Sequence, residues 1–148
     1  MRKKVNRTYL EKLNTVLDCP CGCRVNLREE LISIKTASLP LHLEVYHNYL
    51  VGKFFFYESK VSNKLENLEL ANERFNMIFV SANNRGKELF NPKYYFKTAH
   101  TKYELSKVIS NSDDSDALRK QAINLCKQGL EKNTKSSSLL WLKLELEK

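Results

Sequence analysis

The sequence predicts an all-α fold: an antiparallel stack of about seven helices arranged as helical hairpins, an α-solenoid. Only 4 glycines and 3 prolines occur among the 148 residues, which suits helices better than a turn-rich β fold. Helix-start signals recur along the chain. Gly52 and Ala71 are small residues inside apolar segments, where they would let two helices approach closely, and Phe75 follows Ala71 by one helical turn.

Four helices are predicted in the first half of the chain. A polar residue followed three positions later by Glu is a signature of a helix start, and it occurs at Thr8, Asn26 and Asn63. Pro40 suits the first turn of a further helix. Aromatic residues at 54–57 would also suit a strand, but they end a long periodic run and are assigned to a helix. The predicted helices span about 8–18, 27–37, 40–58 and 64–82.

Three more helices are predicted in the second half. Asn91 before Pro92 reads as an N-cap with a first-turn proline. The acidic run after Ser112 suits the positive end of a helix dipole, and serines at 136–138 precede the last segment. These helices span about 92–110, 115–131 and 138 to the end.

The expected organisation is a basic N-terminal tail at 1–7, a helical pair with a Cys-rich turn at 8–39, and a helical-repeat region at 40–148. No signal peptide and no apolar run long enough to cross a membrane is visible. We therefore expect no membrane association and an intracellular protein, cytoplasmic or nuclear. The net charge of +8 favours acidic partners in general, or simply gives a solubilising surface.

The chain resembles the tetratricopeptide superfamily over about residues 40–148. The residues that carry the resemblance are Leu50, Gly52, Phe55, Ala71, Phe75, Ala122 and Gly129. The proline that often closes such a repeat is replaced by Asn83 and by 133–134. The long hairpins look more like divergent members, such as the helical-repeat subunit of the cohesin loader or bacterial peptide-sensing repeat proteins. The resemblance implies binding of a peptide or extended protein segment in a concave groove, and no catalytic residues.

Two places are predicted to meet a partner. Tyr94 and Lys97 belong to a stretch that mixes lysines with aromatic residues, a pattern that also binds single-stranded nucleic acid. Trp141, with Leu140 and Leu144, gives the last segment an apolar face. We expect Trp141 to dock on the 115–131 helix, with the free face recruiting a second copy of the chain or a partner.

Cys19, Cys21 and Cys23 form the one unusual chemical cluster. Thiolates bind zinc, but a structural zinc site normally uses two Cys-x₂₋₄-Cys pairs, and only one cluster is present. Redox pairing and plain thiols in a tight turn are the alternatives, and plain thiols without a cofactor are the favoured interpretation.

Enzyme signatures are absent from the sequence. No nucleophile elbow, phosphate-binding loop or dinucleotide fingerprint occurs, and His42 and His47 are five residues apart rather than four. The sequence therefore favours a non-enzymatic protein-interaction module, a scaffold or adaptor that binds an extended segment in a helical-repeat groove. The alternative is a nucleic-acid-associated or metal-stabilised regulatory protein that uses the basic N-terminus and the cysteine cluster.

Overall fold

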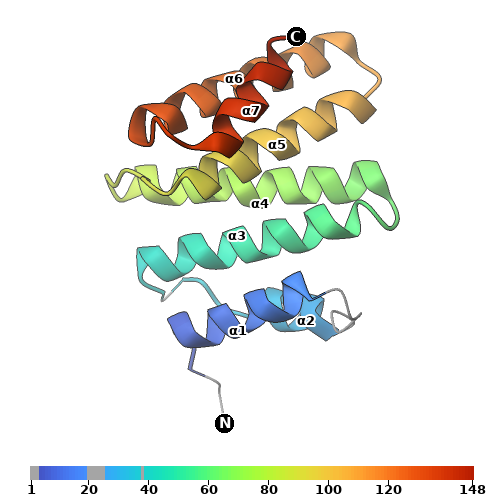
Figure 1. Cartoon of the computed structure of the whole chain (residues 1–148). Coiled ribbons are helices and arrows are strands. Elements are labelled where there is room, and N and C mark those ends of the chain that lie inside the picture. The colour runs from blue at the N-terminus through green and yellow to red at the C-terminus, as the bar shows by residue number, and fades with distance from the viewer. Residues whose placement is uncertain (1–3, 20–25, 38) are drawn as a thin grey trace.

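The protein is all-α. A computed structural model describes residues 4–19, 26–37 and 39–148, and these residues contain seven helices and no strand (Figure 1). The helices are α1 (Arg7–Asp18), α2 (Leu27–Ile32), α3 (Leu41–Glu58), α4 (Lys64–Asn84), α5 (Pro92–Val108), α6 (Ser112–Lys132) and α7 (Ser137–Leu146). The predicted all-α class and the number of helices are thus confirmed for the described residues.

Two of the predicted helix starts are stabilised by the side chains that signalled them. The Asn91 side chain accepts a hydrogen bond from the backbone N–H of Lys93, and Pro92 opens α5. Ser136 accepts from the N–H of Leu139 at the start of α7. For α6 the cap is Asn111, so the acidic run follows inside its first turn. These caps satisfy N–H groups that have no partner within the helix.

The starts of α1, α2 and α4 differ from the sequence prediction. Asn6, rather than Thr8, caps α1 by accepting from the N–H of Tyr9. Asn26 and Asn63 precede α2 and α4 but make no side-chain cap hydrogen bond. Asn63 has a positive φ of 46°, a left-handed conformation that Asn tolerates better than most residues. The second helix is also shorter than predicted, because α2 ends at Ile32 rather than near 37.

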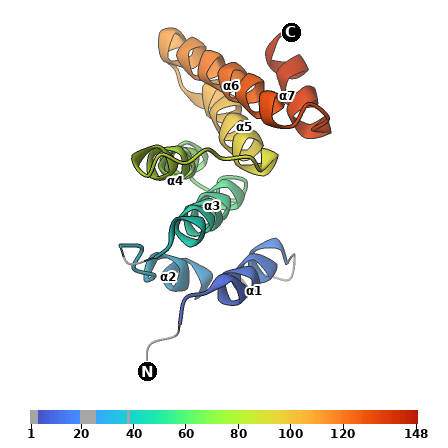
Figure 2. The same ribbon diagram turned by 90° about the vertical axis from the view of Figure 1, so that its left-hand side faces the viewer.

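The helices are stacked in chain order from one end of the molecule to the other. The α1–α2 pair lies at the N-terminal end, α3, α4 and α5 follow, and α6 with α7 forms the C-terminal end (Figures 1 and 2). Neighbours in sequence pack on each other from α3 to α7, and α7 also contacts α5. Short connections bring helices that follow one another in the chain into contact.

Two glycines lie where helices approach most closely. A Cβ atom built on Gly52 of α3 would be 2.5 Å from Cε1 of Phe75 on α4. A Cβ on Gly129 of α6 would be 2.7 Å from Leu139 Cδ1 on α7 and 2.8 Å from Tyr95 Cβ on α5. All three distances are shorter than real Cβ contacts, so a side chain at either glycine would force its neighbours to shift. Ala71 on α4 and Ala122 on α6 are also fully buried.

The core consists of two hydrophobic clusters that meet along α5. The larger cluster joins α1, α2, α3 and α4 and includes Tyr94. The smaller cluster joins α5, α6 and α7 and includes Tyr95. The two neighbouring tyrosines therefore face different clusters, as expected for adjacent positions on a helix, which are separated by about 100°.

Trp141 has a ring contact with α5 that the sequence did not predict. Its ring lies 6.2 Å from the ring of His100 on α5, and half of its surface is exposed. The α7 side chains that bury themselves in the smaller cluster are Leu139, Leu142 and Leu146. The three- and four-residue spacing of these leucines fixes the buried face of α7, and this leaves Trp141 at its edge. Among the described residues, no helix is long and apolar enough to cross a membrane.

Candidate binding groove

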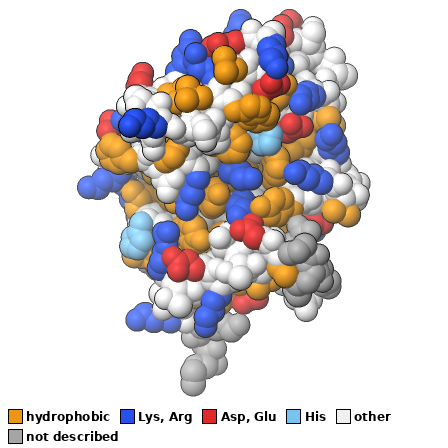
Figure 3. Space-filling view, viewed as in Figure 1, with side chains coloured by type: hydrophobic (Ala, Val, Ile, Leu, Met, Phe, Trp, Pro, Cys, Tyr) orange, Lys and Arg blue, Asp and Glu red, His pale blue; other side chains and the backbone are white. Residues whose placement is uncertain are grey.

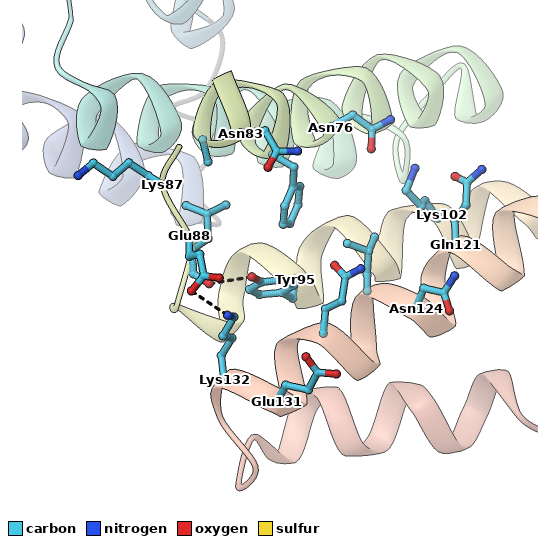
Figure 4. Close-up of a pocket in the computed structure, with 15 residues that line it drawn as sticks. Asn76, Asn83, Lys87, Glu88, Tyr95, Lys102, Gln121, Asn124, Glu131 and Lys132 are labelled. Carbon is cyan, nitrogen blue, oxygen red and sulfur yellow. Dashed lines mark hydrogen bonds and ion pairs between the residues drawn. The ribbon is translucent and has the colours of Figure 1, made fainter. Parts of the chain in front are cut away.

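A groove opens between α4 and α6, over one side of α5 (Figure 4). Its volume is about 610 Å³, within the usual range for ligand sites. The loop between α4 and α5 closes one end through Lys87, Glu88 and Leu89. Two segments more than thirty residues apart in sequence, the second half of α4 and the second half of α6, thus face each other across the groove.

The floor of the groove is apolar. Phe79 and Tyr95 pack edge to face with ring centroids 5.3 Å apart, and Leu125 lies beside them. The Tyr95 hydroxyl donates a hydrogen bond of 2.7 Å to the carbonyl oxygen of Leu89, which fastens the loop to α5. Burial raises the pKa of this hydroxyl, so it remains a neutral donor at physiological pH.

Carboxamide side chains line both walls. Asn76 and Asn83 come from α4, and Gln121, Asn124 and Gln128 come from α6. Within the described part of the chain, none of these five side chains forms a hydrogen bond with another residue. Each carboxamide offers two N–H donors and one oxygen acceptor. The walls therefore present a dense set of donors and acceptors that only water or a ligand can satisfy.

A buried lysine lies at the end of the groove away from the α4–α5 loop (Figure 4). Lys102 on α5 is only 5% exposed, and its Nζ donates a hydrogen bond of 3.0 Å to Asn72 Oδ1 on α4. Burial lowers the pKa of Lys102 to about 8. At neutral pH the amine is still charged, so an electron-rich ligand atom at this position would gain a nearby cation.

An ion pair closes the end of the groove at the loop. Lys132 Nζ, at the end of α6, lies 3.1 Å from Glu88 Oε2 and 5.3 Å from the centroid of the Phe90 ring (Figure 4 shows the ion pair). The side chains of Lys132 and Glu88 are 24% and 67% exposed, so solvent screens the pair and it contributes little to stability. Its position matters more, because it connects the α4–α5 loop to α6 across the groove.

This chemistry suits a polypeptide main chain. A peptide unit carries one N–H donor and one carbonyl acceptor, which a carboxamide can pair at the same time. The apolar floor would accept alternate side chains of an extended segment, since successive side chains point in opposite directions. The groove has hydrogen-bonding groups and one amine, but no nucleophile–base pair among the residues that line it.

The residues predicted to bind a partner lie elsewhere. Tyr94 and Lys97 are on the side of α5 that faces α3, and Trp141 is on α7. The five carboxamides of the groove were missed. The sequence does carry a signal for them, because Gln121, Asn124 and Gln128 recur at spacings of three and four residues on one helix face.

The cysteine cluster is only partly described. Cys19 follows α1 and is disulfide-bonded, whereas Cys126 is a free, buried thiol. The expectation of a plain thiol is therefore wrong for Cys19, because closely spaced thiols can pair with each other instead of staying reduced. A disulfide sulfur is also not the thiolate that zinc needs. Cys21 and Cys23 lie outside the described residues. No group of three potential metal ligands occurs in the described ranges.

The chain matches no protein-family model, and searches of curated proteins and of solved structures return no match either.

Proposed function

We propose that this protein is a non-enzymatic interaction module that binds an extended segment of a partner protein in the α4–α6 groove. The observation that carries the proposal is the set of five unpartnered carboxamides on the two facing walls of a groove with an apolar floor. The proposal also treats α3 to α7 as a divergent helical-hairpin repeat of the tetratricopeptide type. Consecutive antiparallel packing and the close approaches at Gly52 and Gly129 support this assignment.

The dimensions of the groove support an extended ligand. Gln121 and Gln128 are seven residues apart on α6, a rise of about 10 Å along the helix. Three residues of an extended peptide span a similar length of about 10 Å. The α6 wall can therefore contact several consecutive peptide units, and Asn76 and Asn83 can contact the opposite edge of the same segment.

A selection from a random peptide library tests this proposal. Peptides selected on the wild-type protein are measured against the double variant Asn124→Ala/Gln128→Ala. Each lost hydrogen bond is worth about 1 kcal/mol, so the double variant should bind about tenfold or more weakly. Both side chains are exposed on α6, and unfolding should be unaffected.

Asn84→Ala is the matched control, because it truncates an exposed carboxamide on α4 that does not line the groove. Peptides that bind both variants as tightly as the wild type would show that the groove is not the binding site. Failure to select any peptide on the wild-type protein would also count against the proposal.

A further inference from the structure

A second surface, on the opposite side of α5 from the groove, carries alternating cations and aromatic rings. It begins at α1, where Arg7 Cζ lies 4.3 Å from the centroid of the Tyr46 ring. Lys93 Nζ lies 4.9 Å from the same ring and 5.1 Å from the ring of Tyr49. Lys53 Nζ then lies 5.5 Å from Tyr49. Each ring thus has two cations near it.

The alternation continues along α3. Lys53 Nζ is 5.8 Å from the ring of Tyr57, and Lys97 Nζ is 5.7 Å from that ring. Lys97 is also 5.1 Å from the ring of Phe56, where Lys60 follows at 5.2 Å. We call the surface formed by Arg7, Lys53, Lys60, Lys93 and Lys97 the basic face. Figure 3 shows lysine and arginine side chains interspersed with hydrophobic ones across the middle of the molecule.

The charges on the basic face are not balanced. Two of its cations have a carboxylate partner: Arg7 pairs with Glu11 at 3.0 Å and Lys53 pairs with Asp18 at 2.8 Å. The other three have no ion pair or hydrogen bond from Nζ to any residue that the structure describes. They are Lys60, Lys93 and Lys97.

The surroundings of Lys93 and Lys97 disfavour the charged form of their amines. Burial, with repulsion from Arg7 and Lys53, lowers the pKa of Lys93. Burial, with repulsion from Lys53 and Lys60, lowers the pKa of Lys97 to about 8. Glu11 and Asp18 act in the opposite direction on Lys93 and Lys97, but burial and the neighbouring cations outweigh them. A half-buried cation in such surroundings gains from an anion that joins it.

We propose that the basic face is a docking site for an extended acidic segment of a partner protein, whose carboxylates pair with Lys93, Lys97 and Lys60. Lys93 and Lys97 are one turn apart on α5, about 6 Å between their Cβ atoms. Side chains two residues apart on an extended strand are separated by a similar distance, about 7 Å. A segment with acidic residues at alternate positions matches this spacing.

The aromatic rings argue against single-stranded nucleic acid as the ligand. Bases bind such proteins by stacking on exposed aromatic faces. Here Tyr46, Tyr49 and Phe56 are 3%, 7% and 3% exposed, and lysines or arginine already lie near their rings. The rings position the cations but leave almost no surface for a base. Carboxylates can pair with the lysine amines without contacting the faces of the rings.

The proposal does not depend on the α4–α6 groove. Lys93 and Tyr95 are two residues apart on α5, about 200° around the helix, so the basic face and the groove floor point in opposite directions. Variants in one surface leave the other intact, and the two proposals can fail separately.

Fluorescence anisotropy with the full chain tests the proposal. The probe is a labelled peptide of about ten residues, roughly 33 Å when extended, that alternates Glu with Ser. Comparison probes are the matching Lys–Ser peptide and an oligothymidylate of similar length. The variant Lys93→Gln/Lys97→Gln is compared with Lys120→Gln/Lys127→Gln, which makes the same change in net charge on exposed positions of α6.

We expect the Glu–Ser peptide to bind the wild type, to bind the Lys93/Lys97 variant about tenfold or more weakly, and to bind the α6 variant normally. Added salt should weaken binding. The thermal midpoint of the Lys93/Lys97 variant should be unchanged or raised, because repulsion is removed. No binding of the Glu–Ser peptide, equal losses in both variants, or tighter binding of oligothymidylate would each overturn the proposal.

Discussion

Among single residues, His47 has the environment with the clearest consequence for pH. It is 1% exposed, its Nε2 lies 2.7 Å from the carbonyl oxygen of Leu31, and its buried Nδ1 has no partner. Nε2 therefore donates, and the ring is neutral. Burial lowers the pKa of His47, because a proton on Nδ1 would be buried without an acceptor.

This arrangement predicts a loss of stability in mild acid. The unfolded chain takes up the His47 proton near pH 6.5, while the folded chain does so only at lower pH. The free energy of unfolding should thus fall as pH falls below about 6.5, by at most about 1.4 kcal/mol per pH unit for this group. Denaturant unfolding at several pH values measures the slope.

In His47→Gln the slope should be smaller, whatever the change in overall stability. Burial also lowers the pKa of His100. The slope should therefore be smaller still in the double variant His47→Gln/His100→Gln. A slope identical to that of the wild type in both variants would show that these rings do not titrate as their burial predicts.

Among the helices, the α3–α4 pair depends on the close approach at Gly52. Ala is the better helix former by about 1 kcal/mol, so Gly52→Ala would stabilise an isolated helix. In the protein the added Cβ would lie 2.5 Å from Phe75, which is fully buried, so the close-packed core around the ring resists its displacement. We expect Gly52→Ala to lower the free energy of unfolding by about 1–3 kcal/mol, measured by urea denaturation.

A double-mutant cycle separates this clash from a change in backbone propensity. Phe75→Leu removes ring atoms that the new methyl group would meet, so the two substitutions together should destabilise less than the sum of their separate effects. Strict additivity would mean that Gly52 is not in the tight contact described here.

For the whole molecule, the exposed apolar edge of α7 predicts self-association. Leu140, Trp141 and Leu144 are 44%, 50% and 64% exposed and share one side of the helix. Contiguous apolar surface of this kind favours association. Sedimentation velocity at increasing concentration should show association that Trp141→Ala weakens, with little change from Val61→Ala, which removes an exposed apolar side chain far from α7 in sequence. A wild-type protein that stays monomeric throughout would refute this prediction.

The amino-acid sequence was sufficient to predict the all-α class, seven helices and most helix boundaries to within a few residues. These features depend on interactions between residues close in the chain, such as the Asn91 cap with Pro92 or the buried spacing of Leu139, Leu142 and Leu146. The early end of α2 is the main exception. A six-residue helix depends on packing more than on its own signals.

The two candidate surfaces were decided by tertiary structure. The groove needs Asn76 and Asn124 on facing walls, and the basic face needs Lys53 and Lys97 beside one tyrosine ring. The sequence placed Tyr94 and Lys97 on one helix but left open which helix they face. The periodicity of a helix shows which of its residues share a side, but the neighbour of that side depends on how helices distant in sequence pack. For that reason the sequence did not show that the Trp141 ring would meet His100 on α5, or that unpaired lysines would gather on a face that no single segment encodes.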